Sequence, residues 1–150
     1  MNIDRIEKRI LLRVSRPRAW RAIATAAEFG AWFGLKLDAE FVPGQDVLGR
    51  IVEPPGFEHI PLSLMVESVE PESRFAFRWH PYAIDPAHDY SGEPTTLVEF
   101  LLEDVPEGTR LTVIESGFDQ IPPGRRAEAW RMNDEGWGIQ LENIARYVAR

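Results

Sequence analysis

Apolar residues recur at two spacings along this chain: every second residue through most of its first and middle parts, and every third or fourth residue near its end. An alternation of two places neighbouring side chains on opposite faces of a strand, whereas gaps of three and four residues line one face of a helix. The opening segment, Ile3–Val14, alternates and is predicted to form a strand. The pattern as a whole predicts a sheet followed by a long helix.

Two short helices are predicted directly after that first strand. Ser15 can cap free backbone N–H groups, and Pro17 is tolerated in the first turn of a helix. Thr25 and Glu28 have the spacing of a capping box, which predicts that a second helix begins there. Gly34 suits the left-handed position at which many helices end, so we expect the second helix to stop at this residue.

The middle of the chain alternates in further segments that are separated by residues typical of turns. The predicted strands are Lys36–Phe41, Val47–Val52, Leu62–Val69, Arg74–His80, Thr95–Glu103 and Thr109–Phe118. Tyr82–Pro94 is the longest stretch without periodicity, and a loop of that length is usually functional or mobile. Because the strands follow one another without intervening helices, we expect an antiparallel sheet.

The last segment follows Pro122-Pro123-Gly124 and is predicted to be one long helix. Its apolar stripe consists of Trp130, Trp137, Leu141, Ile144 and Val148. A strand, two short helices, a strand meander and a long final helix describe an α+β helix-grip fold, in which a curved antiparallel sheet of about six to seven strands surrounds the C-terminal helix. Residues 1–150 are expected to form a single domain.

Composition and charge narrow the classes of partner. The chain has 44% hydrophobic residues, no cysteine and a formal net charge of −7. The absence of cysteine excludes disulfides and thiolate metal sites, and the acidic charge argues against nucleic acid. No apolar run reaches the length of a membrane span, so we expect no membrane insertion and a cytoplasmic protein. The sequence leaves the oligomeric state open, a homodimer included.

Motifs for cofactors or metals are missing from the sequence. It contains no glycine-rich phosphate loop, no nicotinamide fingerprint and no G-x-S-x-G elbow, so no cofactor is expected. His80, Asp85, His88 and Asp89 form the only cluster of metal-ligand types, but their spacing matches no ligand motif and we expect no metal. The pair at 125–126, both arginines, could bind an anionic head group or lie solvated at the helix start.

Strand alternation assigns side chains to the two faces of the sheet. Phe75, Phe77 and Trp79 share the inner face, and the same parity in the last strand puts Glu115 inside. A buried carboxylate is costly unless it is hydrogen-bonded, so Glu115 could be a polar anchor or a general acid/base with a raised pKa. Alternatively, a bulge at Ser116-Gly117 lets this side chain reach solvent at the strand end.

Several short motifs, in order along nearly the whole chain, carry a family resemblance. They are Arg16-Pro17-Arg18-Ala19-Trp20, Glu28 with Trp32-Phe33-Gly34, Pro43-Gly44, Val69-Glu70-Pro71-Glu72-Ser73-Arg74-Phe75 with Trp79, Gly108-Thr109-Arg110-Leu111-Thr112 with Gly117-Phe118, and Gly136-Trp137 with Leu141, Ile144 and Tyr147. With these motifs the sequence resembles the START-like (SRPBCC) superfamily and, within it, the AHSA-type branch named after the Hsp ATPase activator homologue.

The resemblance implies the fold of the major birch-pollen allergen, with a cavity between sheet and C-terminal helix that binds hydrophobic or amphipathic small molecules in many relatives. Those relatives range from ligand carriers to polyketide cyclases and co-chaperone domains, so fold alone does not settle function. The chaperone activator that names the branch has an additional N-terminal domain. This chain has no room for one, and we therefore do not expect a chaperone partner.

The leading hypothesis is a binding protein whose apolar cavity holds a small hydrophobic or amphipathic molecule. The predicted ligand-binding residues are Phe41, Phe75, Phe77, Trp79, Phe100, Val113, Glu115, Trp137 and Leu141. For Trp79 and Trp137, the sequence does not distinguish a role in core packing from a role in the pocket wall. The alternative is a cyclase- or hydrolase-like enzyme that uses Glu115 or His80 as its catalytic group, and a third hypothesis is a protein-docking domain. The sequence favours binding over catalysis without deciding between them.

Overall fold

The computed structural model describes residues 4–150 as one antiparallel sheet with helices on one of its faces. Ile3, where the first predicted strand begins, lies outside the described residues. The elements in chain order are β1 (Arg5–Leu12), α1 (Arg16–Ala24), α2 (Ala26–Phe33), β2 (Leu35–Leu37), β3 (Asp46–Ile51), β4 (Pro61–Glu70), β5 (Arg74–Trp79), β6 (Thr96–Val105), β7 (Gly108–Ser116), a 3₁₀ turn η1 (Phe118–Gln120) and α3 (Pro123–Val148). The predicted order of strands and helices is confirmed.

The sheet has seven strands in the order β1-β7-β6-β5-β4-β3-β2. Strands β2 to β7 form a meander in which each pairs with the next, and β1 joins antiparallel to β7. The register places Glu115 of β7 opposite Ile6 on one side and Val98 on the other. These pairings confirm the predicted α+β helix-grip fold.

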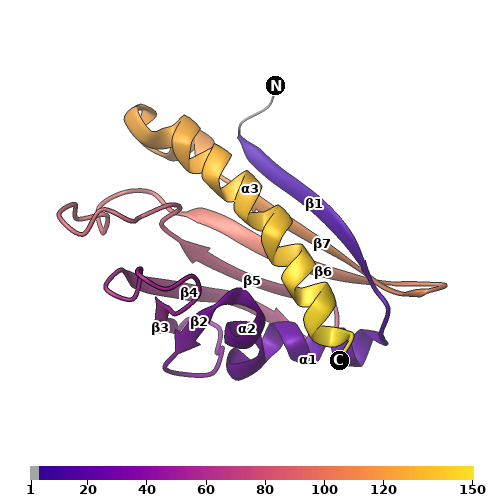
Figure 1. Ribbon diagram of the computed structural model, residues 1–150. Helices are drawn as coiled ribbons and strands as arrows, with labels where there is room; N and C mark the ends of the chain where they lie inside the picture. The colour runs from indigo at the N-terminus through magenta and orange to yellow at the C-terminus, as the bar shows by residue number, and fades with distance from the viewer. Residues whose placement is uncertain (1–3) are drawn as a thin grey trace.

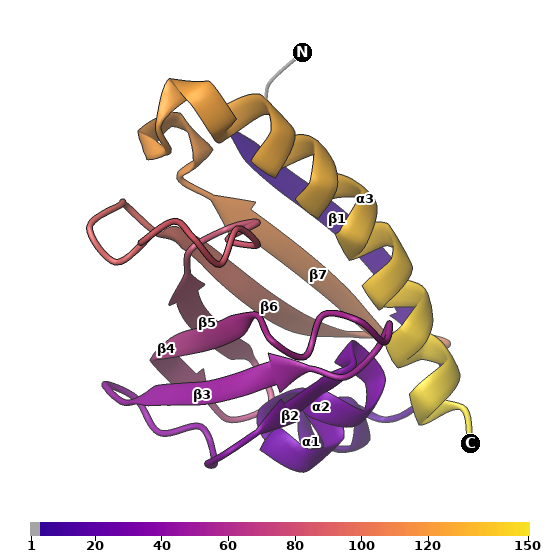
Figure 2. The same cartoon turned by 60° about the vertical axis from the view of Figure 1, so that its left-hand side comes forward.

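Helix α3 crosses one face of the curved sheet, while α1 and α2 lie near the C-terminal end of that helix (Figures 1 and 2). The buried side chains of α3 are Ala129, Trp137, Leu141, Ile144 and Val148. Four of these belong to the predicted stripe. Trp130, the fifth predicted member, is only half-buried, and its indole Nε1 donates to the carbonyl of Arg5 at 3.1 Å. Within residues 4–150, no helix has the length and apolar character that a membrane crossing requires.

Much of the inner face of the sheet is covered by α2 instead of α3. Phe29 of α2 is fully buried and its ring lies 5.6–6.2 Å, centroid to centroid, from four aromatic rings, those of Phe41, Phe75, Phe77 and Phe100. Edge-to-face contacts at such distances are favourable packing arrangements for aromatic rings. This cluster fills the space between α2 and the middle of the sheet with side chains.

The predicted start of α1 and the predicted end of α2 are confirmed, whereas α3 begins at Pro123, inside the Pro-Pro-Gly segment that it was expected to follow. The hydroxyl of Ser15 accepts from the backbone N–H of Arg18 at 3.4 Å, and Gly34 ends α2 with a left-handed φ of 92°. Any side chain at Gly34 would also collide with the backbone, because an added Cβ would lie 2.7 Å from the carbonyl oxygen of Glu53. Gly34 therefore satisfies both a conformational and a steric requirement.

The predicted capping box at the start of α2 is wrong. Thr25 precedes the helix but makes no side-chain capping bond. The Glu28 carboxylate instead binds Arg18 at 2.9 Å and the hydroxyl of Tyr147 at 3.0 Å, joining α2 to α1 and α3. A carboxylate from outside the helix, Glu40, accepts from the N–H of Ala26 at 3.1 Å. Glu28 therefore binds side chains of other helices and does not form the predicted capping bond at the start of its own helix.

The strand predicted for 36–41 is also shorter than expected. Only Leu35–Leu37 pairs with β3, and the chain then leaves the sheet. Phe41 is nevertheless buried, because it packs against Phe29 and Phe75 from the loop. The alternation of apolar and polar residues in this segment therefore does not correspond to a continuous strand that is hydrogen-bonded to β3.

Candidate functional site

A pocket of about 220 Å³ lies between the middle of α3, the end of β5 and the loops that follow β3 and β5. Its walls are mostly apolar and aromatic, which is typical of sites that bind small molecules. The lining residues are Phe33, Leu35, Ile51, Ile60, Leu62, Trp79, His80, Tyr82, Ala83, Ile84, Asn133, Gly136, Trp137 and Gln140. No lysine or arginine is among them.

Helix α3 supplies one wall through a single face. Asn133, Gly136, Trp137 and Gln140 are spaced by three, one and three residues, so they follow one another along one side of the helix. Gly136 leaves this wall recessed, since a Cβ added to it would meet no atom within 4 Å. Glycine in a helix interior costs stability relative to alanine, and at this position it also leaves space open in the pocket.

Glu115 lies behind the aromatic wall of the pocket and is fully buried. Its carboxylate accepts hydrogen bonds from side chains of three other elements. One oxygen receives Trp79 Nε1 of β5 at 2.8 Å and the Thr96 hydroxyl of β6 at 2.6 Å. The other receives Trp137 Nε1 of α3 at 2.8 Å. Asn133 Nδ2 donates to both oxygens at 3.0 and 3.1 Å.

Two features of its environment shift the pKa of Glu115 in opposite directions. Burial raises the pKa of Glu115, and the hydrogen bonds from Thr96, Trp79, Trp137 and Asn133 oppose that shift. Indole N–H groups can only donate, so both carboxylate oxygens serve as acceptors. Within residues 4–150, none of the ion pairs involves Glu115. The structure thus holds a buried carboxylate with neutral donors alone.

This arrangement limits what Glu115 can do to a molecule in the pocket. Its two oxygens already face four donors, and the residue itself does not line the pocket. A proton transfer between Glu115 and a ligand would require Asn133 or one of the indoles to move. The bulge at Ser116-Gly117 that would carry Glu115 to solvent is absent from β7, which pairs with β1 and β6 without a register shift up to Ser116.

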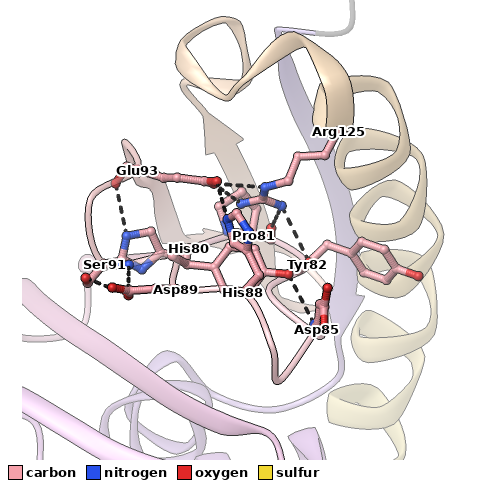
Figure 3. Close-up of polar contacts among 10 residues, drawn as sticks. His80, Pro81, Tyr82, Asp85, His88, Asp89, Ser91, Glu93 and Arg125 are labelled. Carbon is pink, nitrogen blue, oxygen red and sulfur yellow. Dashed lines mark hydrogen bonds and ion pairs between the residues drawn. The ribbon is translucent and has the colours of Figure 1, made fainter.

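The loop between β5 and β6 covers the pocket and is tied to the start of α3 (Figure 3). Arg125 donates from Nε to a carboxylate oxygen of Glu93 at 2.9 Å and from Nη1 to the carbonyl of Pro81 at 2.7 Å. Its guanidinium also lies 4.8 Å from the ring centroid of Tyr90. Arg125 is therefore engaged by the loop and is neither solvated nor directed into the pocket.

The two loop histidines serve different contacts within the loop. His80 Nε2 lies 3.0 Å from the carbonyl oxygen of Glu93, which can only accept, so Nε2 carries a proton. His88 Nε2 lies 2.8 Å from the Glu93 carboxylate. Burial raises the pKa of Glu93, but hydrogen bonds from His88 and Arg125 outweigh it and hold this pKa below its ordinary range.

The carboxylates of the same loop make local turns. Asp85 accepts from the backbone N–H of Ala87 at 3.0 Å, and Asp89 accepts from the N–H and hydroxyl of Ser91 at 3.0 and 2.7 Å. Over the described part of the chain, no group of three or more histidine, cysteine, aspartate or glutamate side chains could hold a metal ion.

The predicted site residues fall into two groups. Trp79, Trp137 and His80 line the pocket, and Glu115 lies directly behind the two tryptophans. The other predicted ligand-binding residues are packed in the hydrophobic core and do not line it: Phe41, Phe75, Phe77, Phe100, Val113 and Leu141. Phe29 packs against the four phenylalanines of this set, so the pocket lies farther toward the β5–β6 loop than alternation suggested.

Sequence reasoning missed the polar residues of the helix wall. Asn133 and Gln140 lie four residues before and three residues after Trp137, which is the spacing of neighbours on one helix face. Once Trp137 is assigned to the wall, the same spacing identifies both amides. Phe33 and Tyr82 had no comparable signal, because they come from a helix end and from an irregular loop.

Comparisons with known proteins agree on family and fold. The family model described as activator of Hsp90 ATPase homolog 1-like protein matches residues 13–149. The solved structure of protein MLL2253 from Mesorhizobium loti superposes with a TM-score of 0.76 at 22% sequence identity, over 97% of each chain. The structure of NE0264 from Nitrosomonas europaea gives a TM-score of 0.74 at 19% identity, over 99% of this chain and 96% of the other.

A third similar structure is the solution structure of the Aha1 dimer from Colwellia psychrerythraea, with a TM-score of 0.69 at 16% identity, over 93% of this chain and 92% of the other. At these identities the structural likeness establishes the fold and not a shared ligand or activity. A search of curated proteins found no match to this sequence.

Proposed function

The chain belongs to the family of activator of Hsp90 ATPase homolog 1-like proteins, and we propose that it binds a small, mostly apolar molecule. The observation that carries this proposal is the pocket of about 220 Å³ between α3 and the β5–β6 loop. Aromatic rings from α2, β5 and α3 line this pocket, and no lysine or arginine does.

The volume of the pocket sets the size of the ligand. An engineered cavity of about 150 Å³ holds benzene, and pockets for drug-sized molecules begin at about 300 Å³. A pocket of about 220 Å³ therefore suits a molecule of one ring or two small ones. The aromatic rings of Phe33, Trp79 and Trp137 in its lining favour a planar or compact apolar group.

The β5–β6 loop provides the route of entry. Tyr82, Ala83 and Ile84 form the loop side of the pocket, and Ile84 is also exposed on the outer surface. Since this side has no regular backbone ladder, it can open with less loss of hydrogen bonding than the sheet or α3. Arg125 anchors the same loop to the helix and so limits how far it moves.

Binding can be tested by filling the pocket from the helix. Gly136 lines the pocket and Gly138 does not, yet an added Cβ meets nothing within 4 Å at either position. We expect Gly136→Leu to abolish binding of small aromatic and aliphatic compounds, and Gly138→Leu to leave it unchanged. Thermal shifts with a panel of such compounds, followed by calorimetric titration of the hits, measure this.

The paired variants separate pocket binding from general hydrophobic association, because both add the same side chain to the same helix. The proposal fails if the wild-type protein binds none of the compounds, or if Gly136→Leu binds them as tightly as Gly138→Leu. Native mass spectrometry of protein purified from its own host adds a second measurement, since a co-purifying molecule is expected in the wild type and not in Gly136→Leu.

A further inference from the structure

The side-chain nitrogen donors around the pocket have acceptors within the protein. Five lining residues carry side-chain nitrogen: Trp79, His80, Asn133, Trp137 and Gln140. In each of them a nitrogen donor is already bound within the protein. The two indoles and Asn133 donate to Glu115, Gln140 donates to the carbonyl of Phe33 at 2.9 Å, and His80 donates to the carbonyl of Glu93.

These bonds fix which atoms of the two amides remain for a ligand. Asn133 Nδ2 faces a carboxylate, and Gln140 Nε2 faces a backbone carbonyl, neither of which is placed to donate. The amide oxygens, Oδ1 of Asn133 and Oε1 of Gln140, therefore point elsewhere, and Gln140 Oε1 accepts only from Asn143 among the described contacts. The polar part of the wall thus leaves one amide acceptor, Asn133 Oδ1, without a partner in residues 4–150, beside the Tyr82 hydroxyl, which can donate or accept.

The aromatic part of the wall has the same electrostatic sign. Phe33, Trp79 and Trp137 contact one another with ring centroids 5.8–6.1 Å apart, and all three line the pocket. Aromatic faces attract cations because the ring quadrupole is negative above the ring. Both indole N–H groups donate to Glu115, and hydrogen bonds of this kind polarise the groups that make them. Donation to an anion thus makes these faces more negative.

A fully buried carboxyl group, that of Glu115, lies behind those rings. The Glu115 carboxylate lies in a low-dielectric region, where a charge acts at longer range than in water, and no positive side chain is bonded to it in residues 4–150. The nearby guanidinium of Arg125 is paired with Glu93 outside the pocket. The formal net charge of −7 adds a field of the same sign around the molecule.

We propose that the ligand of this pocket is a small organic cation, an aryl- or alkylammonium, whose charge lies against the faces of Trp79 and Trp137 and is balanced by the Glu115 carboxylate behind them. This inference rests on the proposed function and names the chemical class of its ligand. The apolar walls hold the hydrocarbon part, and Asn133 lines the same pocket with an amide oxygen that has no hydrogen bond to residues 4–150.

Two compounds of equal shape test the charge alone. Phenyltrimethylammonium carries a permanent positive charge, and tert-butylbenzene is its neutral isostere. We expect the wild-type protein to bind the cation about tenfold or more tightly, the range that a desolvated cation–π contact supplies. Calorimetric or ligand-observed NMR titration at low ionic strength gives both dissociation constants.

The Glu115→Gln variant removes the buried charge, and Glu135→Gln is its matched control, because Glu135 is exposed on α3 next to the pocket-lining Gly136. We expect Glu115→Gln to lose most of the preference for phenyltrimethylammonium while its affinity for tert-butylbenzene is kept, and Glu135→Gln to behave as the wild type. Near-ultraviolet circular dichroism checks that each variant is folded.

The outcomes separate the two proposals. Equal or tighter binding of tert-butylbenzene by the wild type overturns the cation inference and leaves a neutral apolar ligand in place. Failure of both compounds to bind also overturns the cation inference, and the proposed function is then decided by the panel of aromatic and aliphatic compounds described above. The wild-type comparison decides the inference even if Glu115→Gln does not fold, and an unchanged preference in folded Glu115→Gln rejects the role given to the carboxylate.

Discussion

Trp137 Nε1 donates to the Glu115 carboxylate at 2.8 Å, so a hydrogen bond to a fully buried charged group joins α3 to β7. Hydrogen bonds to charged acceptors contribute more than bonds between neutral groups, and a buried acceptor that loses its donor keeps its full desolvation cost. The contact therefore links the helix wall of the pocket to the stability of the whole fold.

Replacing Trp137 by phenylalanine is expected to lower the free energy of unfolding by about 2–4 kcal/mol, from a lost charge-assisted bond and a smaller buried ring. Trp130→Phe is the matched control on the same helix. Trp130 is half-buried and donates to the backbone carbonyl of Arg5, so we expect a loss of about 1 kcal/mol or less. Urea or thermal unfolding measures both.

A double-mutant cycle isolates the hydrogen bond from the change in ring size. If the bond to Glu115 matters, Trp137→Phe costs clearly less in a Glu115→Gln background than in the wild type. Equal costs in both backgrounds would show that ring volume explains the whole effect.

We expect the free energy of unfolding to depend on pH through Glu115 at pH values above about 4.5. Burial raises the folded-state pKa of Glu115 above its ordinary value of 4.5. A group whose folded pKa is raised contributes stability below the unfolded pKa and loses it as pH rises through the folded pKa. The difference in unfolding free energy, wild type minus Glu115→Gln, should therefore fall as pH rises above about 4.5.

Taking this difference removes the opposite contributions of Glu28 and Glu93, whose pKa values are lowered and whose stabilisation is lost on acidification. Denaturant unfolding of both proteins at several pH values provides the curve. A difference that rises with pH would mean that the four hydrogen bonds outweigh burial and that the pKa of Glu115 is lowered.

Alternation along β7 was sufficient to predict that Glu115 faces inward, because Leu111 and Val113 precede it at the same parity. It could not predict that the carboxylate is satisfied. The donors come from Trp79, Thr96 and α3, and residues that distant in sequence meet only through the sheet register and the placement of the helix.

The position of the pocket was also beyond the sequence pattern. Phe75, Phe77 and Phe100 face the helices as predicted, but Phe29 of α2 fills the space in front of them. Which of two helices covers a given part of the sheet depends on how far each one reaches across it. Periodicity identifies the buried face of an element and does not identify its neighbour.

Because Arg125 bonds to the β5–β6 loop, we expect that removing its guanidinium increases local opening of that loop. Arg125→Met removes the contacts to Glu93 and to the carbonyl of Pro81 while keeping much of the side-chain length. We expect amide hydrogens of residues 82–93 to exchange roughly tenfold faster, as losing one or two bonds to a charged group allows. Amides in the centre of α3, measured in the same experiment, report any global effect.

Arg126→Met is the neighbouring control. Arg126 donates to the carbonyl of Ile121 and makes no hydrogen bond or ion pair with the loop within residues 4–150, so its loss should leave exchange in 82–93 unchanged. Equal acceleration in both variants would show that charge at the start of α3 matters, and not the tie between Arg125 and Glu93.

Glycines in the helices are expected to respond oppositely to alanine, according to the space in front of them. At Gly136 and Gly138 of α3 an added Cβ meets nothing within 4 Å, so Gly→Ala should raise the unfolding free energy by about 0.5–1 kcal/mol at each. At Gly30 of α2 the added Cβ would lie 2.4 Å from the carbonyl oxygen of Leu35. Gly30→Ala should therefore destabilise the protein, despite the better helix propensity of alanine.

The comparison between Gly136 and Gly138 bears on why the pocket is open. If both alanine variants of the ligand-free protein gain the same stability, the glycine at Gly136 is not required by the fold, and the space that it leaves in the helix wall serves the pocket. A loss of stability in Gly136→Ala would instead mean that the helix wall closes against this position. Unfolding curves of Gly30→Ala, Gly136→Ala and Gly138→Ala under one set of conditions distinguish these outcomes.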